Sequence, residues 1–227
     1  AWASCSASCW ACIWIVAFAS NLSAFWILVA NSFMQHPVGY VVQNGRAEMT
    51  DFLALITNPY AIGQYAHTLF AGIVTSGMLI LAVCAYKILQ GGIAREAFEK
   101  CMRYAVLYAL AGLLAVMGSG HLQAQQVAHM QPMKLASMEA LWESADPAPL
   151  AAMAVIDVKN ERNTMEVNIP YLLSFMVYNQ PSGEIKGIHA LQQQYEQQYG
   201  PGDYKPDIPG LFVGFRGMAG VGGLMLL

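Results

Sequence analysis

One histidine of the chain lies inside an apolar segment, where an ionisable side chain is costly and marks a functional position by default. It is His67, in the string QYAHTLFAG. Gly63, Ala71 and Thr75 lie one turn before it and one and two turns after it on a helix, so small side chains line the strip beside the imidazole. Such a strip favours a flat macrocycle bound at His67. The alternative is a histidine that hydrogen-bonds another helix across a small-residue contact.

A methionine near the end of the chain has a similar setting. Met218 lies in LFVGFRGMAGVGG between Gly214 and Gly222, at i−4 and i+4, so its sulfur is presented from a groove. We place His67 and Met218 each about one turn inside its helix, at similar depth, and predict that they bind one iron from two sides. A His/Met haem is low-spin and suits an electron acceptor. The alternative is close helix packing along a glycine-rich face.

The last apolar segment carries one charge, Arg216. It precedes Met218 by two residues and therefore points about 200° around the helix from the sulfur. One interpretation is that Arg216 reaches a haem propionate, where a fixed positive charge favours the ferrous state. The alternative is that its side chain extends to the membrane surface.

The string QPMKLASMEALWE, residues 131–143, predicts a short helix in a polar segment, with Glu139, Trp142 and Glu143 on one face. Lys134 and Glu139 are about 140° apart on an ideal helix, so they are expected to flank a ligand rather than pair. A quinol that loses two electrons also loses two protons, which requires a carboxylate acceptor and a donor to the quinone oxygen. Glu139 and Lys134 fit these roles. The alternative is that both are merely solvated.

The first apolar segment contains SNLSAFWILVANSFMQHP, with Ser23 and Asn31 two turns apart and Trp26 between them. Polar groups in lipid need partners, so these residues line either a proton or cofactor cavity or a helix–helix contact made by hydrogen bonds. The remaining histidines lie at expected helix ends or in the polar segment without a second ligand at useful spacing: His36, His121, His129 and His189.

The amino-acid composition indicates that the protein lies in a membrane. The 227 residues are 56% hydrophobic and only 11% charged, with a mean hydropathy of +0.41, which indicates an all-α bundle of transmembrane helices. A net charge of −3 supplies no basic surface for nucleic acid. Cys5, Cys9 and Cys12 recur at helical spacing in an apolar run, which favours packing over a metal cluster.

Four segments approach the length of a spanning helix, the first within residues 1–33: Trp10–Phe33, Ala66–Tyr86, Tyr104–His121 and Leu211–Leu227. Residues 87–103 carry four basic residues and residues 34–65 carry one, so the positive-inside rule places 87–103 in the cytoplasm. Residues 34–65 and the long segment 122–210 then lie outside. Both ends of the chain stop within apolar sequence, so we expect an internal piece of a larger protein with truncated first and fourth spans.

The long outer segment contains local structure. Ile188, Leu191, Tyr195 and Tyr199 follow helical spacing and predict an amphipathic surface helix. Residues 169–178, IPYLLSFMVY, are apolar but too short to span, so we expect them at the interface or under the loop as a membrane-facing plug.

The quoted strings SNLSAFWILVANSFMQHP, QYAHTLFAG, QPMKLASMEALWE and FRGM, in this order, resemble subunit I of the cytochrome bd-type quinol oxidases. The resemblance extends from about Ile13 to the end of the chain, and the outer segment is similar to the short form of the family's quinol-binding loop. We find no counterpart in this sequence of the family's first helices, with the histidine and glutamate that serve the high-spin haems, or of its last helices, with the GRQPW-type motif.

This resemblance implies that His67 and Met218 are the axial ligands of a low-spin haem b, that Arg216 tunes it, and that Lys134 and Glu139 bind and oxidise quinol. Ser23, Asn31 and Trp26 correspond to positions near the proton route and the high-spin haems. The intact subunit would also bind a high-spin haem b and haem d. It would assemble with subunit II and small single-span subunits in the bacterial inner membrane, and the complex would oxidise ubiquinol or menaquinol. The alternatives are a non-catalytic haem-binding electron-transfer anchor and a transporter.

Overall fold

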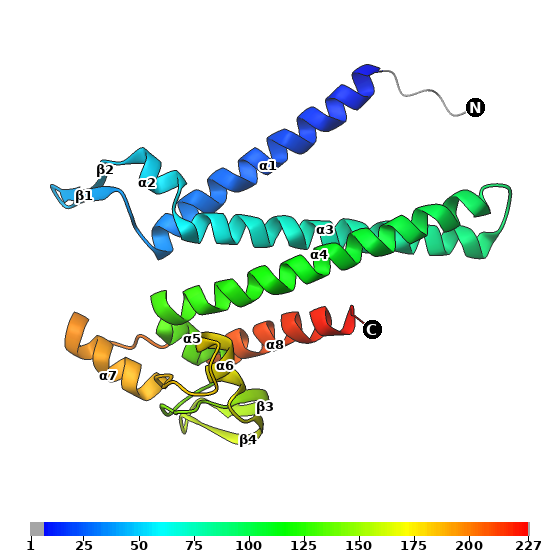
Figure 1. Cartoon of the computed structure of the whole chain (residues 1–227). Helices are drawn as coiled ribbons and strands as arrows, with labels where there is room; N and C mark the ends of the chain where they lie inside the picture. The colour runs from blue at the N-terminus through cyan, green and yellow to red at the C-terminus, as the bar shows by residue number, and fades with distance from the viewer. Residues whose placement is uncertain (1–6, 227) are drawn as a thin grey trace. The chain divides into compact units, whose positions relative to one another are not determined.

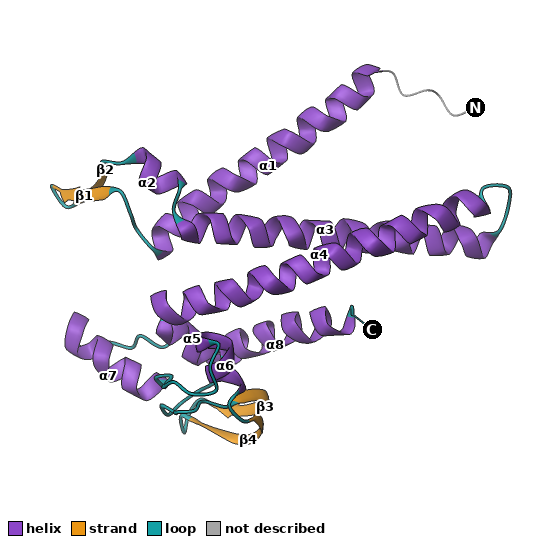
Figure 2. Cartoon of the chain, viewed as in Figure 1, coloured by secondary structure: helices purple, strands orange, loops and turns teal. Residues whose placement is uncertain are grey.

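The computed structural model describes residues 7–226, and most of them are helical (Figures 1 and 2). The chain forms two compact units, residues 1–72 and 73–227. Three helical stretches are long and apolar enough to cross a membrane: Ser8–Gln35, Phe52–Gln90 and Arg95–Met130. The chain is therefore a multi-pass membrane protein built mainly of helices, as predicted. Cys5 lies outside the described residues, whereas Cys9 and Cys12 are exposed on the first helix.

The first unit contains helix α1 (Ala7–Gln35), a hairpin of strands β1 (Tyr40–Gln43) and β2 (Arg46–Met49), and helix α2 (Phe52–Ile56). The Asn44–Gly45 turn gives both residues positive φ, 53° and 74°, which matches the twist of a two-residue hairpin. The segment 34–65, predicted only as a loop, is thus partly ordered.

Helix α3 (Pro59–Gln90) begins earlier than the predicted Ala66. Proline suits the first helical position, and the Asn58 side chain accepts a hydrogen bond from the backbone N–H of Tyr60 at 3.0 Å. The Asn58 amide also donates to the His36 carbonyl at 3.1 Å, which ties the helix start to the end of α1. His67 consequently lies about two turns inside α3, so the prediction of one turn was wrong.

Helix α4 (Arg95–Met130) continues well past the predicted end at His121. In the second unit, α4 packs against residues 73–90 of α3 through small residues. A Cβ at Gly77 would lie 2.8 Å from the Cβ of Ala109, so the two helices approach closely only because position 77 has no side chain.

The rest of the second unit is an ordered domain after α4, visible at the lower part of Figure 1. Its elements in chain order are α5 (Pro132–Met138), β3 (Leu150–Asp157), β4 (Arg162–Ile169), α6 (Leu172–Tyr178), α7 (Ile188–Tyr199) and α8 (Ile208–Leu224). Strands β3 and β4 form an antiparallel hairpin that the sequence analysis did not predict. Two apolar clusters hold these elements together, one around Trp142, Ile188 and Phe212 and one around Leu135, Leu173 and Ile185.

Three sequence predictions for this domain have different outcomes. The amphipathic helix is confirmed as α7, with Ile188 and Leu191 buried. The apolar segment 169–178 was predicted at the interface or under the loop. Its residues 172–178 form α6, which buries Leu173 and Val177 under the loop. The helix predicted over residues 131–143 ends at Met138, so its continuation was wrong. The reason is Ala140, whose φ of +48° is incompatible with a right-handed helix.

Candidate functional site

The most enclosed charged group of the described chain outside the long helices is Glu139, at the end of α5. Glu139 is only 3% exposed to solvent, and its two carboxylate oxygens face the guanidinium of Arg216 on α8. Arg216 Nη2 contacts Oε2, and Nη1 lies 3.4 Å from Oε1. A buried carboxylate of this kind needs a charge partner, because desolvation of an unpaired ion is costly. The pair therefore joins the end of α5 to α8.

Arg216 is held in place by more than Glu139. Its Nε donates to the carbonyl of Ala151 at 2.7 Å, where an irregularity interrupts the β3–β4 pairing. The guanidinium carbon also lies 4.9 Å from the ring centre of the buried Phe212. The side chain is only 16% exposed, so it does not extend to the surface as one alternative proposed.

Burial raises the pKa of the Glu139 carboxyl above its ordinary value, while the hydrogen bond and positive charge of Arg216 offset part of the rise. The alternative that Glu139 is merely solvated was therefore wrong. A carboxylate with a raised pKa is suited to accept a proton near neutral pH.

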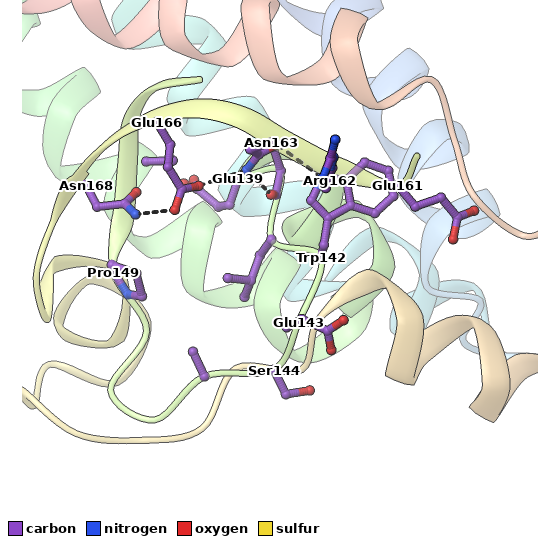
Figure 3. A pocket seen from close by; sticks show the side chains of 14 residues that line it. Glu139, Trp142, Glu143, Ser144, Pro149, Glu161, Arg162, Asn163, Glu166 and Asn168 are labelled. Atoms are coloured by element: carbon purple, nitrogen blue, oxygen red, sulfur yellow. Dashed lines mark hydrogen bonds between the residues drawn. The ribbon is translucent and has the colours of Figure 1, made fainter. Parts of the chain in front are cut away.

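Glu139 lies at the edge of a pocket of about 370 Å³ (Figure 3). One wall is the chain from Glu139 to Ala145, and the opposite wall is the β3–β4 hairpin with Asn163, Glu166 and Asn168. This volume is in the range of pockets that enclose small organic ligands. The pocket combines apolar surface from Leu141 and Trp142 with several polar groups, the usual lining of a small-molecule site.

Asn163 connects the two walls of the pocket. Its Nδ2 donates to the Ala140 carbonyl and to Glu166 Oε2, both at 3.0 Å, and its Oδ1 accepts from the indole N–H of Trp142 at 3.1 Å. These bonds fix the left-handed turn at Ala140 that directs Glu139 toward α8. Asn163 is therefore a positioning residue for Glu139.

A second polar cluster adjoins the pocket and shares Glu143 and Glu161 with it. His189 Nδ1 lies 2.8 Å from Glu143 Oε1, and Nε2 lies 3.1 Å from Glu161 Oε2. Lys205 contacts the other oxygen of Glu161 and lowers the pKa of that carboxyl. The His189 ring also packs on Trp142, with ring centres 5.6 Å apart. This clamp attaches α7 to the hairpin and to the turn after α5.

The clamp depends on the absence of a side chain at Gly187. A Cβ there would overlap the backbone of Trp142 and Glu143, which has no rotamer by which to move aside. We expect Gly187→Ala to destabilise the domain that follows α4 by about 1–3 kcal/mol, the usual cost of overpacking. Limited proteolysis of the intact protein measures the effect.

Gly202→Ala is the matched control, because a Cβ there meets only the Tyr204 ring at ordinary contact distance, 3.5 Å. Equal protease resistance of the two variants would show that the predicted overlap is relieved without cost.

Lys134 lies half-buried on α5 but is not among the residues that line the pocket with Glu139. In the first unit, Ser23 and Trp26 are exposed on α1, and the Asn31 side chain accepts a hydrogen bond from Gln35 one turn later on the same helix. The roles proposed for these four residues remain predictions.

His67 and Met218 lie in different units and are described separately. His67 is half-buried on α3 beside Gly63 and Ala71. Met218 is 59% exposed on α8, about three turns after the start of the helix, so it too lies deeper than predicted. A Cβ at Gly214 or Gly222 would meet no described atom within 4 Å. The open glycine face beside Met218 leaves room for a flat ligand, and imidazole and thioether are each donors that haem iron accepts.

Sequence reasoning missed Asn163, Glu166 and the clamp formed by Glu143, Glu161 and His189. The alternation NTMEVNI in residues 163–169, after the turn sequence KNE, was a usable signal for the hairpin. Nothing local indicated that Asn163 and Glu166 would line a pocket with Glu139, because they are separated from it by more than twenty positions and meet it only through the fold.

Comparison with known proteins places these residues in a family. The sequence model of "Cytochrome bd terminal oxidase subunit I" matches residues 5–227, so the similarity begins before the predicted Ile13. Cytochrome bd ubiquinol oxidase subunit 1 of Bacillus subtilis is 46% identical over 95% of this chain and 46% of the relative. Cytochrome bd-II ubiquinol oxidase subunit 1 of Escherichia coli is 34% identical over 93% and 44%.

A solved structure agrees with the sequence relatives. The bd oxidase from Geobacillus thermodenitrificans matches with a TM-score of 0.76 and 25% identity, over 92% of this chain and 46% of the matched chain. The chain thus spans about half the length of the relatives it matches.

Proposed function

Because the chain belongs to the cytochrome bd terminal oxidase subunit I family, we propose that it forms the quinol-oxidising part of a bd-type oxidase. The observation that carries this proposal is the buried Glu139–Arg216 pair at the edge of a pocket of suitable size. In the proposed reaction, quinol binds in this pocket and Glu139 accepts one of its protons. The family similarity supports Lys134 as a second quinol-binding residue, acting from α5.

His67 and Met218 are the residues that would hold a low-spin haem b. When bound, that haem supplies a one-electron acceptor for the quinol. Arg216 lies two residues from Met218 on α8, so its charge would also favour the reduced haem. Ser23, Asn31 and Trp26 would lie near the proton route or the high-spin haems.

The intact protein would pass the electrons to a high-spin haem b and haem d, which reduce oxygen to water, together with subunit II and small single-span subunits. We place residues 87–103 in the cytoplasm and residues 34–65 and 122–210 outside, which supports release of quinol protons at the outer face and a proton motive force. The substrate would be ubiquinol or menaquinol.

Glu139→Gln in the intact oxidase tests this proposal. We expect quinol-dependent oxygen uptake per haem to fall at least about 100-fold, the usual contribution of a general base, because glutamine accepts no proton. Uptake with tetramethyl-p-phenylenediamine, a donor that loses no proton, should persist. Haem content per protein shows that the variant assembles.

Lys186→Gln, on an exposed residue of the same outer domain, serves as the control. Wild-type quinol oxidation by Glu139→Gln would contradict the proposed site. A haem protein without quinol-dependent uptake would favour the electron-transfer anchor, and a haem-free protein would favour the transporter.

A further inference from the structure

Quinol oxidation releases two protons, and Glu139 accepts only one at a time. We propose that Glu166 is the second proton acceptor of this pocket, a catalytic carboxylate that takes a quinol proton and passes it to solvent. The inference rests on the proposed function of the pocket. In the balanced step, both quinol O–H bonds break, one proton goes to Glu139 and the other to Glu166, two electrons go to a one-electron acceptor such as the haem that His67 and Met218 would hold, and quinone remains.

The pocket is lined by four glutamates, and two of them are engaged by His189 and Lys205, side chains that do not line it. Glu143 and Glu161 each contact a ring nitrogen of His189, and Glu161 also pairs with Lys205. Lys205 lowers the pKa of the Glu161 carboxyl, whereas burial raises the pKa of Glu139 despite its Arg216 partner, so Glu161 is the poorer proton acceptor. Figure 3 shows the Glu161 carboxylate pointing away from Glu139 and Asn163.

Glu166 has a different environment. Asn163 Nδ2 donates to its Oε2 at 3.0 Å and Asn168 Nδ2 donates to its Oε1 at 2.6 Å. Both donors are neutral amides, so they orient the carboxylate without adding a positive charge that would oppose protonation. Arg162 is the cation among the residues that line the pocket, and it forms no ion pair with Glu166 in the described part of the chain.

The positions of Glu139 and Glu166 suggest a direction for proton release. Glu139 is buried and held from the α8 side by Arg216, whereas Glu166 is exposed on the hairpin at the same pocket. Asn163 links the two sites, since it bonds both Glu166 and the carbonyl of Ala140, the residue after Glu139. A proton on Glu166 reaches water directly, while a proton on Glu139 has to leave through the pocket.

The test uses Glu166→Gln and Glu166→Ala in the intact oxidase. We expect each to lower the kcat of quinol-dependent oxygen uptake about 10-fold, with little change in KM, because water replaces an exposed base only in part. The pH profile of kcat should change, and uptake with tetramethyl-p-phenylenediamine should stay at the wild-type level. Added formate should restore part of the activity of Glu166→Ala, since it supplies the missing carboxylate.

Glu184→Gln is the matched control, because Glu184 is an exposed carboxylate of the same domain that does not line this pocket. A Glu166→Gln variant that behaves like Glu184→Gln overturns the inference, and so does a loss of activity with an unchanged pH profile and no formate rescue, which would indicate disturbed packing at Asn163. If Glu139→Gln also retains quinol oxidation, the proposed function fails as well; if only Glu139→Gln is inactive, the second acceptor alone is wrong.

Discussion

Met218→Leu is expected to abolish the low-spin haem spectrum of the intact oxidase. Leucine preserves the apolar volume of the side chain but offers no lone pair to iron, so the haem would lose its thioether ligand and become high-spin. Because Met218 is exposed on α8, removal of its sulfur leaves the packing of the described chain intact. The change in spin state is measured by optical and electron paramagnetic resonance spectra of the purified protein.

Two further variants make this prediction specific. Met225→Leu replaces another methionine at the end of the same helix and should leave the spectrum unchanged. Met218→His should restore a low-spin haem with a lower midpoint potential, because the thioether raises the potential relative to imidazole. A normal low-spin spectrum in Met218→Leu would show that another residue opposes His67, and a normal spectrum in His67→Ala would remove the other half of the assignment.

Sequence predictions succeeded where the structure depends on residues close together in the chain, and failed where it depends on contacts between distant residues. Helix α7 was predicted because its buried residues recur at helical spacing within twelve positions. The spanning helices were found from apolar length, but their ends were not, since Pro59 and the extension of α4 to Met130 depend on caps and on packing outside the apolar stretch.

The candidate site shows the opposite case. Glu139 and Arg216 were each selected from their own neighbourhoods, yet neither was expected to meet the other, because 77 positions separate them. A contact between distant residues also explains why the predicted helix over residues 131–143 ends early, at Met138. The Ala140 carbonyl is held by Asn163 of strand β4, so a tertiary hydrogen bond overrides the local helical pattern.

The pairing of Glu139 with Arg216 predicts how the pH dependence responds to loss of the arginine. In the proposed function, quinol oxidation requires ionised Glu139, so activity should fall as pH drops through the pKa of this carboxyl. Burial raises that pKa and Arg216 lowers it. In Arg216→Leu the opposing effect is lost and the pKa rises further, so we expect the acid limb of the kcat profile to move to higher pH.

The same pair predicts opposite changes in the potential of the low-spin haem. Arg216→Leu removes a positive charge near Met218 and should lower the midpoint potential, whereas Glu139→Gln removes the negative charge that compensates Arg216 and should raise it. Each shift should be on the order of tens of millivolts, since partly buried unit charges contribute about 1–2 kcal/mol. The double variant should lie near the wild type, because both charges are then absent. Redox titration of the intact oxidase measures these shifts; equal potentials in all four proteins would show that the pair orients the proton acceptor without influencing the haem.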